Sequence, residues 1–226
     1  MRPVRLCSIL AFFLASTACH ASDQLEILRR QVVSIIGAPG SGKCTGVVIA
    51  PNRVLTAAHC LTAPASAYSV EMIGPDGAIH RAKVAAHRRH PLFNRTAIET
   101  NGNGHDVAVL RLAEPLPGDA MPARVAAADS SGPVLAVGME GGFYPDVSNR
   151  LRVMRLAVAG GTMDKLMLEP TAGGGGQPCH GDSGGPVFRK TAKGFALVAI
   201  ISWGSPKCNG ETAATIVGKY RPFLGS

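Results

Sequence analysis

The chain has 226 residues, which is enough for one large all-β domain or two small ones around a sizeable core. Charged residues make up only 17 % of it, against 27 glycines and 16 prolines, so the composition argues against long surface helices and favours short strands joined by turns. The formal net charge of +8 comes from dispersed basic residues. We interpret this charge as an aid to solubility and expect no nucleic-acid partner.

The first 21 residues have the pattern of a secretory signal peptide. Arg2 and Arg5 precede an apolar run over residues 6–14, and small residues follow over 15–18. We expect cleavage near residue 18 or 21 and one folded domain over 22–226. The product is then secreted or periplasmic.

Membrane attachment is a weaker interpretation of the same region. The apolar run is too short for a permanent membrane helix, and no later run offers about twenty apolar residues, so we predict no transmembrane segment. A lipid anchor on Cys19 is an alternative, but Ser16 fits poorly the apolar position that such signals usually carry.

Short β-branched or apolar runs bounded by turn residues predict strands along the chain. The predicted strands are Val32–Ile36, Thr45–Ala50, Val54–Ala57, Tyr68–Ile73, Ile79–His87, Val107–Leu112, Val134–Gly138, Leu151–Ala159, Lys165–Glu169, Val187–Arg189 and Phe195–Trp203. Residues 22–30 read as a helical turn or a loose arm, and Tyr220–Leu224 as a short terminal helix. The Pro- and Ala-rich stretch 112–128 indicates a connection between two halves, and the glycine-rich stretch 171–178 a mobile loop.

The cysteines suit an oxidising compartment. Cys7 and Cys19 lie in or beside the signal, which leaves four in the folded part: Cys44, Cys60, Cys179 and Cys208. Four cysteines suit two disulfides, and spacing alone leaves three pairings open. Because neither zinc-ligand spacing nor a CxxC motif occurs, we expect no metal and no cofactor.

The most specific segment is Gly181–Pro186, with the sequence Gly-Asp-Ser-Gly-Gly-Pro. A serine hydroxyl is a weak nucleophile and needs a base to take its proton. The glycines let backbone N–H groups turn toward the oxyanion that forms when a carbonyl is attacked, and each such donor lowers the barrier by roughly 3–4 kcal/mol. Read alone, the string could be a plain turn, but we interpret Ser183 as a nucleophile.

Two further residues complete a catalytic constellation. His59 ends an apolar strand beside Cys60 and is the candidate base, whereas the other histidines lack comparable context. Asp106 opens the apolar run 107–112, where a buried carboxylate would be costly without a partner. The order His, Asp, Ser is one of the chain orders in which this triad occurs.

These segments, together with Ser202-Trp203-Gly204, resemble the trypsin/chymotrypsin-like serine peptidase family from about Val32 to Leu224, and the chain reads as a secreted, bacterial member. A Ser-His-Asp triad is the catalytic machinery of that family. The resemblance implies an all-β fold of two six-stranded antiparallel barrels, at about 32–115 and 125–215, with the triad at their interface.

The resemblance also implies roles for individual residues. Gly181 and Ser183 would supply the oxyanion donors, and Ser202, Trp203 and Gly204 would bind a peptide as an added antiparallel strand. His180 would flank the substrate cleft. The implied disulfides are Cys44–Cys60 and Cys179–Cys208, each stabilising the fold by about 3 kcal/mol in the chain-entropy model.

Some positions depart from the family pattern. Gln177 stands where trypsin-like enzymes carry the acid that pairs with a substrate Lys or Arg. In an alignment without gaps, Ala214 stands at a glycine of the pocket wall and would narrow the pocket. We therefore expect a preference for a small or polar neutral residue. Family members commonly mature by a cut before an Ile-Val-Gly-Gly-like sequence, and the new N-terminal ammonium pairs with the acid that precedes the catalytic serine. No such sequence occurs here. The partner of Asp182 and the question of zymogen activation therefore stay open.

The sequence therefore predicts a secreted, monomeric serine endopeptidase that acts on protein or peptide substrates through an acyl-enzyme. The alternative is a catalytically silent form of the same fold that binds peptides or envelope partners.

Overall fold

A computed structural model describes residues 24–38, 42–99, 103–128, 131–139, 151–205 and 207–225. The predicted signal peptide, with Cys7 and Cys19, lies outside the described residues. Within the described ranges, no helix has both the length and the apolar character needed to cross a membrane.

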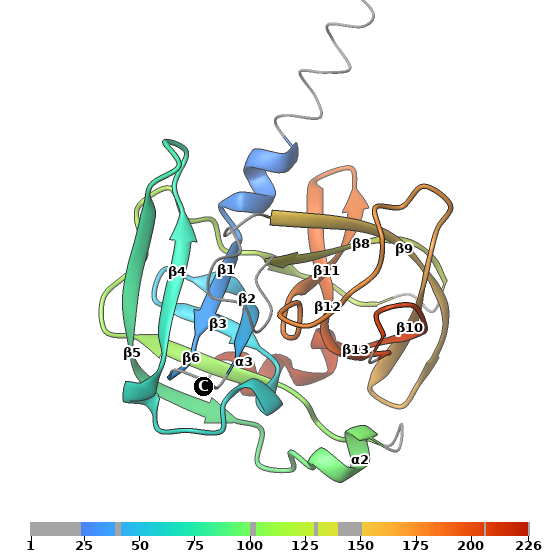
Figure 1. Cartoon of the computed structure of the whole chain (residues 1–226), viewed down its shortest axis with the longest axis horizontal. Helices are drawn as coiled ribbons and strands as arrows, with labels where there is room; N and C mark the ends of the chain where they lie inside the picture. Colours follow the sequence, from blue (N-terminus) through green and yellow to red (C-terminus); the bar gives the residue numbers. More distant parts are fainter. Residues whose placement is uncertain are drawn as a thin grey trace, which may run out of the picture.

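The first half of the chain forms a closed antiparallel barrel in the order β1-β2-β3-β6-β5-β4 (Figure 1). Its strands are β1 (Val32–Ile36), β2 (Lys43–Ala50), β3 (Arg53–Thr56), β4 (Ser69–Ile73), β5 (Ile79–Arg89) and β6 (Ala108–Leu112). Inward-facing aliphatic side chains such as Val33, Val54 and Leu110 are fully buried and form its core. The β-branched runs seen in the sequence are therefore the walls of a barrel.

The second half forms a sheet in the order β11-β8-β9-β10-β13-β12-β7, which a further β11–β12 pairing closes. Its strands are β7 (Arg124–Val125), β8 (Gly132–Met139), β9 (Leu151–Thr162), β10 (Lys165–Pro170), β11 (Pro186–Thr191), β12 (Gly194–Gly204) and β13 (Thr212–Ile216). The six long strands pair antiparallel, and only the two-residue β7 joins β12 in parallel. The expected pair of six-stranded antiparallel barrels is confirmed.

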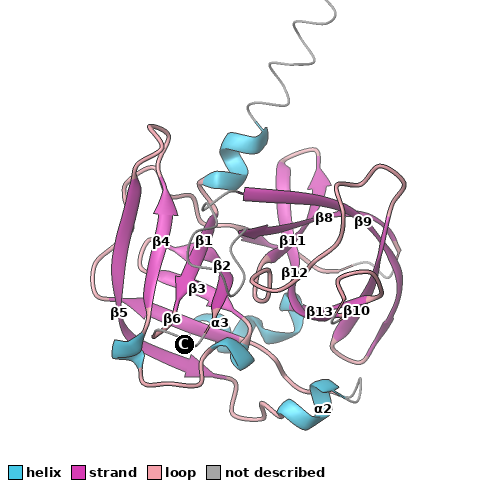
Figure 2. Cartoon of the chain, in the orientation of Figure 1, coloured by secondary structure: helices cyan, strands magenta, loops and turns pink. Residues whose placement is uncertain are grey.

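The helices are short and lie beside the strands (Figure 2). They are a helix over 24–29, η1 (Ala58–Cys60), η2 (Ala65–Ala67), α2 (Arg95–Glu99), η3 (Val217–Tyr220) and α3 (Arg221–Gly225). The predicted terminal helix is therefore present, and the glycine-rich stretch 171–178 contains no strand or helix.

The two barrels share one apolar core between them. Val47, Leu55 and Val109 of the first barrel pack in the same cluster as Phe188 and Leu197 of the second. The C-terminal helix joins this cluster through Leu224, whose carbonyl accepts a 3.3 Å hydrogen bond from Arg53 Nη1. The interface between the barrels is thus a packed core, which holds side chains from both halves in fixed relation.

Candidate active site

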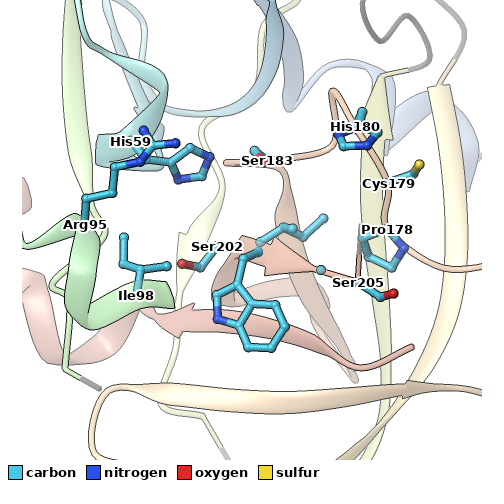
Figure 3. Close-up of a pocket in the computed structure, with 12 residues that line it drawn as sticks. His59, Arg95, Ile98, Pro178, Cys179, His180, Ser183, Ser202 and Ser205 are labelled. Carbon is cyan, nitrogen blue, oxygen red and sulfur yellow. The ribbon is translucent and has the colours of Figure 1, made fainter. Parts of the chain in front are cut away.

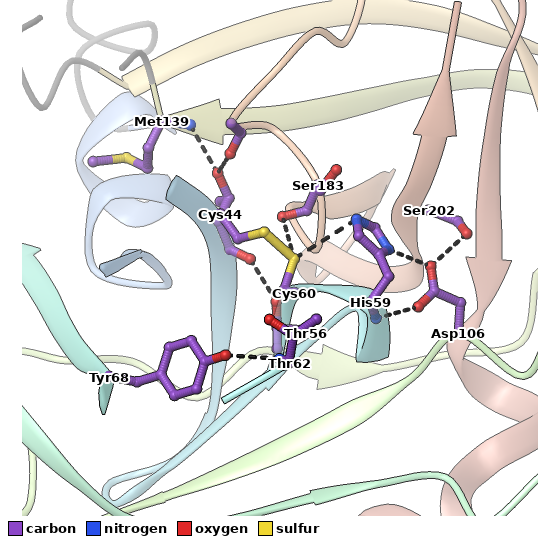
Figure 4. Close-up of a disulfide and its surroundings, with 12 residues drawn as sticks. Cys44, Thr56, His59, Cys60, Thr62, Tyr68, Asp106, Met139, Ser183 and Ser202 are labelled. Carbon is purple, nitrogen blue, oxygen red and sulfur yellow. Dashed lines mark hydrogen bonds and ion pairs between the residues drawn. A yellow bond between two sulfur atoms is a disulfide. The ribbon is translucent and has the colours of Figure 1, made fainter. Parts of the chain in front are cut away.

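The candidate site is assembled from both barrels. His59 belongs to η1, directly after β3, and Asp106 lies two residues before β6. Ser183 lies in the turn before β11, and Ser202 lies on β12. Figure 4 shows these four side chains grouped where the two barrels meet. The structure therefore brings together the three residues that the sequence suggested as a triad.

Asp106 is completely buried and is held by three hydrogen bonds. His59 Nδ1 lies 2.8 Å from Oδ2, the backbone N–H of His59 donates to Oδ1 at 2.9 Å, and Ser202 Oγ donates to Oδ2 at 2.6 Å. Burial opposes ionisation of the carboxyl. The charge of His59 and these hydrogen bonds outweigh burial and hold the pKa of Asp106 below its usual value.

An ionised Asp106 fixes the tautomer of the imidazole. A carboxylate only accepts hydrogen bonds, so Nδ1 of His59 must donate to it, and in the neutral ring Nε2 then carries the lone pair. Ser183 and His59 line the same cavity and lie next to each other in Figure 3. The arrangement can therefore accept a proton on the side of the ring that faces the serine.

The turn around Ser183 is fixed by contacts from the first barrel. The N–H of Thr45 donates to the Ser183 carbonyl at 2.8 Å, and Thr45 Oγ1 donates to the Gly181 carbonyl at 2.8 Å. Gly184 has φ +80°, and a Cβ there would overlap with Oγ1 of Thr56. Only glycine fits that position, because both the backbone conformation and the space exclude a side chain.

The N–H groups of this turn divide into two sets. The amides of Asp182 and Gly184 donate to backbone carbonyls, at 3.0 Å and 2.7 Å. Within the described parts of the chain, the amides of Gly181 and Ser183 have no such acceptor. Backbone N–H groups rarely stay unpaired away from water, so these two are suited to receive an oxyanion.

A cavity of about 210 Å³ opens beside Ser183 (Figure 3). Its described lining is His59, Arg95, Ile98, Pro178, Cys179, His180, Ser183, Ile201, Ser202, Trp203, Gly204 and Ser205. Four residues that the sequence suggested for substrate binding are among them: His180, Ser202, Trp203 and Gly204. Arg95 and Ile98, from the α2 segment, were not anticipated, since the sequence shows no strand or motif there.

Two of the suggested specificity residues do not line this cavity. Ala214 is fully buried in the core of the second barrel and pairs with Ile201, so it is not part of the pocket wall. The residue paired with Gly204 is Thr212 instead. Gln177 lies just outside the lining, and its carbonyl accepts a 3.3 Å hydrogen bond from Arg152 Nη2.

Two disulfides frame the site. Cys44–Cys60 ties β2 to the segment of His59, and Cys60 Sγ lies 3.9 Å from His59 Nε2 (Figure 4). Cys179–Cys208 joins two segments beside the cavity. These are the pairings that the family resemblance implied, and they fit an extracellular protein.

Asp182 also has a partner that sequence reasoning missed. Arg152 of β9 places Nη1 3.0 Å from Oδ2 of Asp182. The sequence signal was weak, because an arginine in a strand normally points to solvent.

Two antiparallel barrels, with a His–Asp pair whose carboxylate is buried and a Gly-Asp-Ser-Gly turn between them, define the class of trypsin-like serine proteases. The family model described as Trypsin matches residues 28–224. The chain therefore belongs to the trypsin family.

Individual relatives agree with this assignment. Glucanase inhibitor protein 1 of Phytophthora sojae is 30 % identical over 207 residues, covering 83 % of this chain and 77 % of that protein. Trypsin of Simulium vittatum is 28 % identical over 180 residues, covering 71 % of this chain and 70 % of that protein. The solved structure of mouse neuropsin, a serine protease, matches with a TM-score of 0.68 at 22 % identity, over 88 % of this chain and 95 % of neuropsin. At that identity, neuropsin supports the fold alone.

Proposed function

We propose that this protein is a secreted serine endopeptidase in which Ser183 is the nucleophile, His59 the general base and Asp106 its orienting partner. The observation that carries the proposal is the completely buried Asp106 carboxylate, which receives both the ring and the backbone N–H of His59. A structural histidine at a strand end needs no such double contact.

The proposed reaction assigns a step to each of these residues. Ser183 Oγ attacks the peptide carbonyl while His59 Nε2 takes the hydroxyl proton, and the N–H groups of Gly181 and Ser183 stabilise the oxyanion. The protonated imidazole then gives its proton to the leaving amine, so an acyl-enzyme forms and the C–N bond breaks. Water, activated by the same imidazole, hydrolyses the ester and restores Ser183.

Substrate binding uses the edge of β12. Its segment Ser202–Gly204 borders the cavity and suits a peptide added as an antiparallel strand. The described lining contains no carboxylate, which supports a preference for a small or polar neutral side chain over Lys or Arg.

A catalytically silent binding protein is the second candidate. The relatives named glucanase inhibitors favour it, since their printed names describe inhibition and not hydrolysis. The Asp106–His59 pair favours the peptidase, and so do the amides of Gly181 and Ser183, which have no backbone acceptor within the described parts of the chain. Catalysis would use both features, whereas binding a peptide requires neither.

Covalent labelling with a fluorophosphonate separates the two candidates. Attack of Ser183 Oγ on phosphorus displaces fluoride and marks the protein, so we expect the secreted protein to label and Ser183→Ala to remain unlabelled. Ser205→Ala is the matched control, because Ser205 lines the same cavity and has no part in the proposed chemistry. Folded protein that resists labelling before and after limited proteolysis would rule out the peptidase.

A further inference from the structure

Asp182 is a buried carboxylate at a sensitive position. Its side chain is 1 % exposed, and it stands between Gly181 and Ser183, the two residues whose N–H groups would bind the oxyanion. A buried charge is costly unless it is paired and hydrogen-bonded. Whatever neutralises Asp182 inside the protein therefore also fixes the backbone of the oxyanion turn.

The neighbouring sheet provides a site for this carboxylate. Gly138 of β8 and Arg152 of β9 are direct cross-strand partners, so they face the same side of the sheet. A Cβ at Gly138 would overlap with Oδ1 of Asp182, so the absence of a side chain there makes the room that the carboxylate occupies. Across the ladder, Arg152 Nη1 donates to Oδ2 at 3.0 Å.

Arg152 connects the pocket with the oxyanion turn. Its Nη2 donates to the Gln177 carbonyl at 3.3 Å, while the N–H of Cys179 donates to Oδ2 of Asp182 at 2.8 Å. One guanidinium thus holds both ends of the segment 177–182. This segment supplies part of the cavity wall and leads directly into Ser183.

The chain just before β1 is already built into the fold. The Arg30 carbonyl accepts from the N–H of Met121 at 2.7 Å, and the Gln31 carbonyl accepts from the N–H of Val48 at 2.8 Å. A cut between Arg30 and Gln31 would divide a segment that is anchored on both sides. This segment is therefore unsuited to deliver a new chain end to Asp182.

We propose that Arg152 is a positioning residue that takes the place of the activating ammonium and holds the oxyanion turn in its competent form without a proteolytic cut. The inference rests on the proposed peptidase function. In this proposal the Arg152 guanidinium does what a new N-terminal ammonium does after activation cleavage. The enzyme would then be active as soon as it has folded.

The first test compares Arg152→Gln, Arg152→Lys and the control Arg155→Gln, which removes an exposed arginine of the same strand. We expect kcat for a peptide ester to fall on the order of 10²-fold in Arg152→Gln, the usual effect of losing an oxyanion donor, with a smaller change in KM. Lys should restore part of kcat, and Arg155→Gln should match the wild type. Equal kcat in Arg152→Gln and the wild type would overturn the inference.

The second test asks whether a free chain end is needed. A short peptide is added before the mature N-terminus, and the mass of this extended protein is measured to show that no cut has occurred. The extended protein is then treated with fluorophosphonate. If it labels at the same rate as the unextended protein, the activating group is internal. Labelling that appears only after a defined cut would keep the peptidase function and overturn the role of Arg152, whereas no labelling under either condition would overturn both.

Discussion

Thr45 Oγ1 donates a 2.8 Å hydrogen bond to the carbonyl of Gly181 and accepts one of 3.1 Å from the N–H of Met139. This single hydroxyl, completely buried on β2 of the first barrel, therefore contacts two separate segments of the second. It holds the carbonyl of Gly181, while Arg152 holds the side chain of Asp182. The geometry of the candidate oxyanion site thus depends on the contact between the barrels.

Replacing Thr45 by valine should expose this dependence. The change keeps the shape but leaves the Met139 N–H and the Gly181 carbonyl without their partner, so we expect a loss of about 1–3 kcal/mol in the free energy of unfolding. Fluorophosphonate labelling should also slow. Thr45→Ser, which retains the hydroxyl, should recover most of both quantities, measured by urea unfolding and labelling rate. An unchanged labelling rate in Thr45→Val would show that the hydroxyl does not position the turn.

The lowered pKa of Asp106 makes part of the free energy of unfolding depend on pH. Its folded-state pKa lies below the ordinary 3.8, so the unfolded chain binds the proton more readily and the stabilisation is present above about pH 4. It is lost as the pH falls through the folded-state pKa. We expect Asp106→Asn to flatten this acid-induced loss, measured by urea unfolding at several pH values, relative to Asp76→Asn, which alters an exposed carboxylate. Identical pH profiles for the two variants would contradict this account.

Most of the strands could be predicted from the sequence because they consist of β-branched and aliphatic runs. Val32–Ile36 was predicted with its observed bounds, and the others differ mainly at their ends. β13 was missed because Thr212–Ile216 reads Thr-Ala-Ala-Thr-Ile, with alanines at its centre that carry little strand preference. Tertiary pairing with β10 and β12 makes it a strand.

The candidate site was predictable where chemistry demands particular residue types. His59, Asp106 and Ser183 stand in recognisable local contexts, so they could be found without a structure. Thr45 and Arg152 could not, because their roles depend on partners 136 and 30 residues away in the sequence. The cavity wall was misjudged at Ala214 for a related reason, since the register of a strand decides which side chains face a pocket.

Substrate selection should follow the charge of the cavity. No carboxylate is found among its described lining residues, so a substrate Lys or Arg would be buried without a partner at a cost of about 3–5 kcal/mol. We therefore expect kcat/KM for cleavage after Lys or Arg to be at least about 10²-fold below that for a small neutral residue, since 1.36 kcal/mol corresponds to tenfold. A peptide library with one varied position measures this. Efficient cleavage after Arg would overturn the expected specificity.

Tyr220 provides a test of stability remote from the proposed nucleophile. Its hydroxyl donates to Oδ2 of the buried Asp164 at 2.6 Å, and burial together with this hydrogen bond raises the pKa of Tyr220 far above its usual value. Tyr220→Phe removes the donor, and we expect the free energy of unfolding at neutral pH to fall by about 1–3 kcal/mol. Met163→Ala, an exposed side chain next to Asp164, should leave it unchanged.

The same phenol predicts a change at alkaline pH. Because its folded-state pKa is raised, its stabilising contribution is complete below about pH 10, the pKa of an unfolded tyrosine, and is lost as the pH rises toward the folded-state pKa. Tyr220→Phe should therefore reduce the alkaline decline in unfolding free energy relative to the wild type. A spectrophotometric titration counts the tyrosine hydroxyls that ionise near pH 10. Unfolded Tyr220→Phe should show one fewer than the unfolded wild type, whereas the two folded proteins should show the same number. If folded Tyr220→Phe shows one fewer ionising hydroxyl near pH 10 than the folded wild type, Tyr220 ionises freely and its hydrogen bond to Asp164 contributes little.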